Sequence, residues 1–352
     1  MKLFLKSKKL WLLVAALVII FLILPMALTA HLYNDVFGVR VDVTDNYYDY
    51  IKEKRPGFIR EGVKFSSNRG QQLQGYFYRY AAEDYKGLVV MAHGMGGGQD
   101  SYIAEAQYLA ENGYLVFCYD NTGTNESEGK ALIGLSQSTI DLDYAISFVE
   151  SITELGRFPL VLYGHSWGGF AVTSVGNFNH RVKGIVSVAG FEKNSNVLKQ
   201  QGKKLLGDFV GAFMPYVNLY ERILFGANAR YTGTNGLENS TAKVLIIQSE
   251  DDQIVDYNEN FMAYKNAFAD NDRFTFLSIP DHGHNAVLSP RANFSIQQLR
   301  KQMEALGEDT QSDEYRKLKS EEFSLILDLD REIMDSIVGF YDSVCVPPPA
   351  AN

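Results

Sequence analysis

The sequence predicts an α/β fold in which helices flank a mostly parallel central sheet, and two observations lead to this prediction. Short apolar runs typical of buried strands alternate with stretches whose apolar residues recur at helical spacing. One of these runs, residues 160–163, leads directly into a G-x-S-x-G pattern at 164–168 and then into a helix-compatible segment. Strands separated by helices require right-handed crossovers, which place neighbouring strands parallel.

The expected elements follow in order from residue 61. The first two strands form a hairpin through the turn-rich stretch 67–70. Further strands are expected at 87–92, 114–119, 160–163, 182–189, 244–247 and 274–277, with helices near 102–111 and 142–152. A final helix packed on the sheet is expected from the shared apolar face of Ile326, Leu329, Ile333, Ile337 and Phe340.

An insertion interrupts this alternation after the sixth strand. Roughly fifty residues separate Gly190 from Lys243, where a crossover needs far fewer. This interval concentrates large apolar side chains: Phe209, Phe213, Met214, Tyr216, Tyr220, Leu224 and Phe225. We expect a helical cap at about 191–241 that shapes an apolar cleft; an ordinary crossover helix with a long loop is the alternative.

The N-terminal segment has the composition of a membrane anchor. Residues 1–9 carry four lysines, and 10–30 form an uncharged run long enough to span a bilayer as a helix. The lysines favour a cytoplasmic N-terminus, which predicts a single-pass membrane protein whose main domain is extracytoplasmic. A cleaved signal peptide and secretion are the alternative. Residues 31–60 are expected to form a membrane-proximal linker with a short helix, 61–345 the main domain and 346–352 a tail.

Composition excludes some classes of partner and site. The net charge of −9 argues against nucleic acid as a partner. The two cysteines, Cys118 and Cys345, form no C-x-x-C pattern, so we expect neither a metal site nor a structural disulfide. No cofactor is expected, and the sequence does not indicate an oligomeric state.

Ser166 is the predicted nucleophile. A sharp strand-to-helix turn exposes the serine hydroxyl at the top of a sheet. Gly164 and Gly168 are expected to support the turn, because a Cβ at either position would clash.

A serine nucleophile requires a base and an orienting carboxylate. Among six histidines, His284 follows the last expected strand and is preferred to its neighbour His282. Asp252 is the preferred acid, with Asp251 as the near alternative and Glu192 as a more distant one.

The predicted oxyanion site consists of two backbone amides. The glycine-rich loop 93–98 follows a buried strand and brings the amide of Met95 forward, with His93 and Gly94 as supporting residues. The second amide belongs to Trp167, which follows the nucleophile.

The order of these motifs resembles the α/β-hydrolase superfamily, specifically its monoglyceride-lipase-like and proline-iminopeptidase-like branches. The resemblance covers residues 61–345 and includes the stretch 120–127, where Thr122 and Asn125 depart from the usual Arg and Gly. Ser249 likewise stands where a Gly is usual.

The resemblance and the residues together imply a serine hydrolase that cleaves carboxylic esters, with an esterase or lipase as the first expectation and a small-molecule ester or lipid-like compound as substrate. A peptidase releasing N-terminal residues is the alternative; it would need an acid for the substrate amine, such as Glu192, Asp208 or Glu221. An acyltransferase is a further alternative, and a non-catalytic binding protein is the least favoured.

Overall fold

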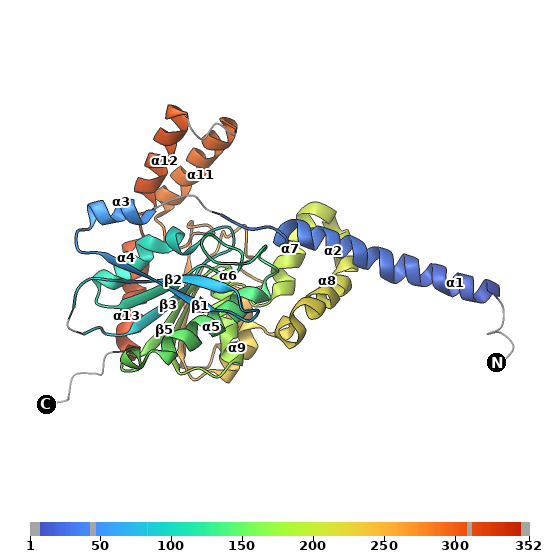
Figure 1. Ribbon diagram of the computed structural model, residues 1–352, viewed down its shortest axis with the longest axis horizontal. Helices are drawn as coiled ribbons and strands as arrows, with labels where there is room; N and C mark the ends of the chain where they lie inside the picture. The colour runs from blue at the N-terminus through green and yellow to red at the C-terminus, as the bar shows by residue number, and fades with distance from the viewer. Residues whose placement is uncertain (1–7, 43–46, 83, 308–311, 346–352) are drawn as a thin grey trace.

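The fold is built around an eight-stranded sheet (Figure 1). The computed structural model describes residues 8–42, 47–82, 84–307 and 312–345. The strand order is β1-β2-β4-β3-β5-β6-β7-β8; β2 runs antiparallel to both neighbours and the remaining pairs are parallel. The strands are β1 Ile59–Ser66, β2 Gln72–Arg79, β3 Leu88–Ala92, β4 Leu115–Tyr119, β5 Leu160–His165, β6 Val182–Val188, β7 Lys243–Ser249 and β8 Phe274–Ile279. The predicted α/β fold with a mostly parallel sheet is confirmed.

Helices cover both faces of the sheet. The α-helices are α1 Lys8–Val18, α2 Leu24–Phe37, α3 Tyr47–Lys54, α4 Ile103–Glu111, α5 Ser136–Ser151, α6 Trp167–Ser174, α7 Asn194–Leu206, α8 Val210–Phe225, α9 Gly233–Asn239, α10 Phe261–Phe268, α11 Pro290–Ala305, α12 Asp313–Leu325 and α13 Arg331–Cys345. Buried side chains of α3, α4 and α13 form one core with the sheet, and those of α5, α6 and α10 form the other. Every residue of β3, β4 and β5 is buried, as expected for strands covered on both faces.

The N-terminal helix extends further than the sequence predicted. It continues from α1 through a π-helical turn, η2 Ile19–Ile23, into α2, which ends at Phe37 rather than at Ala30. Between Leu10 and Phe37 it is long and apolar enough to cross a membrane, judged by length and composition. Tyr33 and Phe37, placed by the sequence in a linker, are instead buried helical residues. The basic tail lies mostly outside the described residues, and the C-terminal tail lies wholly outside them.

The insertion after β6 divides into two parts. Helices α7 and α8 lie beside α2, away from the sheet (Figure 1). Helix α9 instead packs on α6: a Cβ on Gly236 would lie 2.2 Å from the carbonyl oxygen of Thr173. The cap that stands apart from the sheet is therefore α7 and α8, a narrower unit than the interval 191–241.

The C-terminal prediction of one helix is wrong in its boundaries. Ile326 and Leu329 lie in the connection between α12 and α13. Helix α13 begins at Arg331 because the side chain of Asp330 accepts a hydrogen bond from the Ile333 amide, which caps the first turn. Ile333 and Ile337 are buried on this helix, as expected for a helix that packs on the sheet.

Candidate active site

Ser166 lies in a strained turn between β5 and α6. Its φ of 56° and ψ of −112° are rare for a residue with a side chain. The turn is tight: a Cβ on Gly164 would lie 2.1 Å from the Gly168 carbonyl oxygen, and one on Gly168 would lie 1.9 Å from that of Ala92. Both glycines are therefore required by close backbone approach, and the serine is held at the end of β5.

The structure brings together three residues that the sequence singled out. The Oγ atom of Ser166 lies 2.9 Å from Nε2 of His284. The other ring nitrogen, Nδ1, lies 2.9 Å from Oδ2 of Asp252. With Nδ1 protonated toward the carboxylate, Nε2 is free to accept the serine proton.

Asp252 is fixed by the loop that follows β7. Its side chain is fully buried, and its Oδ1 accepts hydrogen bonds from the amides of Ile254 and Val255 at 2.8 and 3.0 Å. Asp251 has another contact, since its Oδ1 accepts a hydrogen bond from the Gly283 amide at 2.9 Å. The structure therefore places Asp252 at the imidazole of His284 and Asp251 against the loop that carries it.

His282 points away from Ser166. Its Nε2 lies 3.0 Å from Oδ2 of Asp330, and its Nδ1 lies 2.6 Å from the Pro280 carbonyl oxygen. These contacts join the histidine loop to the start of α13. His282 therefore stabilises the fold through these contacts, while His284 faces Ser166.

The two predicted oxyanion amides belong to different elements, the loop after β3 and the first turn of α6. Trp167 is the first residue of α6, so its N–H has no acceptor within that helix. In the glycine-rich loop, the Gly94 amide already donates a hydrogen bond to the Tyr102 hydroxyl at 2.9 Å, so it does not serve as an oxyanion donor. The amide of Met95 is the next along the loop, and its role as an oxyanion donor stays a prediction.

His93 holds this loop against the neighbouring strand end. Its Nε2 accepts a hydrogen bond from the Asn121 amide at 2.9 Å, and its Nδ1 donates to the Gly94 carbonyl oxygen at 2.8 Å. Burial lowers the pKa of His93 to about 4, so the ring is neutral. Within the described part of the chain, no group of three His, Cys, Asp or Glu side chains is arranged to hold a metal ion.

Comparisons with known proteins agree with the observed fold. Residues 83–236 match the family model for serine aminopeptidases of the S33 type. An esterase of Pyrococcus furiosus superposes with a TM-score of 0.55 at 14% identity, over 76% of this chain and 94% of the other. An acylaminoacyl peptidase of Pyrococcus horikoshii gives 0.54 at 15% identity, over 88% of this chain and 45% of the other.

The chain has the α/β-hydrolase fold. Among curated sequences it is 30% identical over 132 residues to the quorum-quenching protein AidA of Acinetobacter baumannii, over 37% of this chain and 43% of that protein. It is 23% identical over 166 residues to a proline iminopeptidase of Thermoplasma volcanium, over 46% of this chain and 54% of the relative. The matches thus span about half the length of these relatives.

The departures from the usual hydrolase pattern are compensated locally. Thr122 donates its amide to the buried carboxylate of Asp141 at 2.8 Å, which holds the loop after β4. Asn125 adopts a φ of 42°, a conformation that Asn tolerates better than most residues, and donates to Asp120 Oδ1 at 3.2 Å. Ser249 accepts a hydrogen bond from the His282 amide at 3.1 Å, so it joins the acid and histidine loops.

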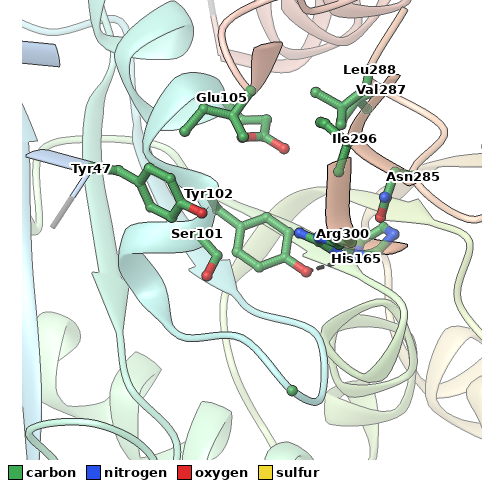
Figure 2. Close-up of a pocket in the computed structure, with 12 residues that line it drawn as sticks. Tyr47, Ser101, Tyr102, Glu105, His165, Asn285, Val287, Leu288, Ile296 and Arg300 are labelled. Carbon is green, nitrogen blue, oxygen red and sulfur yellow. Dashed lines mark hydrogen bonds between the residues drawn. The ribbon is translucent and has the colours of Figure 1, made fainter. Parts of the chain in front are cut away.

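The candidate site contains one residue that the sequence prediction missed. His165 precedes Ser166 in the chain, and its Nε2 donates to the backbone carbonyl of His284 at 2.9 Å. Its Nδ1 accepts from the Tyr102 hydroxyl at 2.7 Å (Figure 2). Burial lowers the pKa of His165 to about 4, which keeps the ring neutral, as this arrangement requires.

The resulting chain of hydrogen bonds connects three parts of the site. It runs from the Gly94 amide through Tyr102 and His165 to the backbone of His284. Tyr102 and His165 line a pocket of about 170 Å³ (Figure 2). The oxyanion loop and the histidine loop are thus fixed relative to each other, a relation that no local sequence pattern reports.

Proposed function

We propose that this hydrolase cleaves carboxylic esters through an acyl-enzyme on Ser166. The observation that carries the proposal is the hydrogen-bonded series from Ser166 Oγ through His284 to the buried carboxylate of Asp252. A serine hydroxyl is a poor nucleophile at neutral pH, and a base at hydrogen-bond distance is what activates it.

The proposed reaction has two halves. Ser166 Oγ attacks the ester carbonyl while its proton passes to His284 Nε2, and the amides of Met95 and Trp167 stabilise the resulting oxyanion. The intermediate collapses as His284 returns the proton to the leaving alcohol. Water then attacks the acyl-enzyme with His284 as base, which releases the carboxylic acid and restores the Ser166 hydroxyl. Asp252 fixes the tautomer of His284 and stabilises the imidazolium.

An aminopeptidase is the second candidate, favoured by the S33 family model and by the proline iminopeptidase relative. It would need a carboxylate for the substrate's α-amine. Each acid that could serve already has a partner. Glu221 accepts hydrogen bonds from Tyr33 and Asn194. The exposed carboxylate of Asp208 pairs with Lys203, and a carboxylate oxygen of Glu192 lies 3.7 Å from the Lys193 ammonium nitrogen. Because these acids already have partners, an ester is favoured as substrate over a peptide with a free α-amine.

The proposal includes anchoring by the N-terminal helix. The apolar stretch and the lysines before it support a single span with the catalytic domain outside the cytoplasm. Protease treatment of intact cells or spheroplasts tests the orientation: digestion of the hydrolase domain is expected. Protection until lysis would reverse the orientation, and a mature protein free in the medium would favour a cleaved signal.

The chemistry is tested by a substrate panel on the purified full chain. p-Nitrophenyl esters of increasing chain length are compared with aminoacyl-naphthylamides. We expect turnover of the esters to exceed that of the amides. Preferential release of naphthylamine would favour the peptidase, and turnover of neither class would contradict the proposed function.

A further inference from the structure

An apolar cavity lies between the N-terminal helix and the cap. Its volume is about 180 Å³, larger than the ~150 Å³ engineered cavity that binds benzene in another protein. Helix α2 contributes Leu32 and Val36 to its wall, and the cap helices contribute Leu198 and Val217. Because apolar side chains dominate this lining, the cavity fits a hydrocarbon chain better than a polar molecule.

This cavity connects to the proposed reaction centre through two lining residues. Met95 contributes its side chain to the cavity, and its amide is one of the proposed oxyanion donors. Leu135 also lines the cavity, and its carbonyl oxygen accepts a hydrogen bond from the Trp167 indole at 2.6 Å. A chain held in the cavity would therefore extend from the immediate surroundings of Ser166.

The same helix that lines the cavity continues into the proposed membrane span. The 28 residues from Leu10 to Phe37 correspond to about 42 Å of helix, against about 30 Å of bilayer hydrocarbon. The end of the helix therefore projects beyond the hydrocarbon, and this end carries Leu32 and Val36.

The cap contacts the proposed membrane span. The Tyr216 hydroxyl on α8 donates to the Phe21 carbonyl oxygen at 2.5 Å, within the apolar run. Phe209 and Ile223 of the insertion are 80% and 65% exposed, a large exposure for such side chains. Figure 1 shows α8 beside α2. The cap is thus in a position to contact lipid.

We propose that the cavity holds the acyl chain of a lipid ester that enters from the outer leaflet of the membrane, with the anchor helix as one wall of the substrate site. This inference rests on the proposed ester hydrolysis at Ser166. The part of the chain next to the ester occupies the cavity, and the remainder stays in the bilayer. The anchor then has two roles, attachment and substrate recognition.

The test compares a membrane-embedded ester with a water-soluble one. The full chain is reconstituted in phosphatidylcholine vesicles, and the ratio of p-nitrophenyl palmitate to p-nitrophenyl acetate turnover is measured. Val217→Trp and Leu32→Trp fill the cavity from the cap and from α2. Their neighbours provide matched controls, Asn218→Trp and His31→Trp, at exposed positions outside the cavity lining.

We expect the palmitate-to-acetate ratio to fall at least tenfold in both cavity variants and to stay within twofold of wild type in both controls. Labelling of each variant by a fluorophosphonate normalises the rates to folded sites. An unchanged ratio in the cavity variants, or an equal fall in the controls, overturns the inference. If the wild-type protein cleaves the acetate ester but not the palmitate ester, the inference is overturned and the proposed function stands. If the wild-type protein cleaves neither ester, the proposed function itself is contradicted.

A second measurement avoids substitutions. A palmitoyl ester carrying a diazirine on the acyl chain is photolysed in vesicles with the unmodified protein. We expect adducts on α2 between residues 29 and 37 and on α7 or α8. Adducts confined to other parts of the chain would contradict the proposed site.

Discussion

Replacing Glu221 by glutamine should make the protein less sensitive to alkaline pH. Glu221 is only 2% exposed, and its Oε1 accepts hydrogen bonds from Tyr33 of α2 at 3.0 Å and from Asn194 of α7 at 3.3 Å. The carboxyl group thus joins the anchor helix to both cap helices. Burial raises its pKa from 4.5 to about 7.

The size of the effect follows from this shift. In the unfolded chain Glu221 ionises near its ordinary pKa, whereas the folded protein keeps the proton until about pH 7. Stability contributed by this group is therefore full at low pH and is lost as the pH rises from 4.5 through 7. A shift of this size corresponds to about 3 kcal/mol in the free energy of unfolding.

Glu221→Gln removes the ionisation and keeps the acceptor for Tyr33. The new amide can also donate to Asn194 Oδ1, which is buried and has no hydrogen-bond partner among the described residues. For a large domain, 1 kcal/mol corresponds to about 2 °C in melting temperature. The melting temperature of the variant minus that of wild type should therefore increase by about 5 °C when the pH is raised from 5 to 9.

The assay is thermal unfolding of the full chain in detergent across this pH range. Glu238→Gln, at an exposed position on α9, is the matched control and should show no such trend. A difference between Glu221→Gln and wild type that does not depend on pH, or that decreases as the pH rises, would refute the reasoning.

Three further predictions follow from the site and the anchor. His284→Ala should lower kcat for p-nitrophenyl acetate by about 10⁴–10⁶-fold, as loss of a triad member does. His282→Ala should lower kcat by less than about tenfold and should mainly lower the melting temperature. The reverse order of the two kcat effects would make His282 the base. Gly168→Ala should prevent folding, because the new Cβ would lie 1.9 Å from a backbone oxygen. Gly211→Ala is the control and should be tolerated, because its Cβ would meet open space. A soluble and active Gly168→Ala protein would contradict the proposed turn. Deletion of residues 1–30 should yield a soluble protein that still cleaves p-nitrophenyl acetate, because Tyr33 and Phe37 are retained; loss of acetate turnover in a folded product would show that the span itself supports the site.

The sequence predicted the features that depend on local patterns. The turn at Ser166 requires only a strand, a helix and two glycines, all contiguous in the chain. The loops carrying Asp252 and His284 could be placed because both follow strands of a parallel sheet, whose carboxyl ends share one edge. Each of these assignments rests on residues close to one another in sequence.

Contacts between distant segments could not be predicted in this way. Tyr33 and Glu221 are 188 positions apart, and nothing in either segment indicates the other. The last turns of α2 bury Tyr33 and Phe37 in a cluster that includes Trp167, a contact that the apolar run does not indicate, so the run alone predicted too short a helix. The role of His165 depends on the Tyr102 hydroxyl and the His284 carbonyl oxygen, which only the folded chain brings together.

The most direct test of the account is active-site labelling of Ser166. The full chain and its Ser166→Ala variant are treated with a fluorophosphonate probe, and p-nitrophenyl acetate turnover and melting temperature are measured on the same samples. The account predicts a labelled wild type and an unlabelled variant with a similar melting temperature and a kcat lower by about 10⁴–10⁶-fold. Labelling of the variant, or a kcat within tenfold of wild type, would place the nucleophile elsewhere and contradict the proposed mechanism.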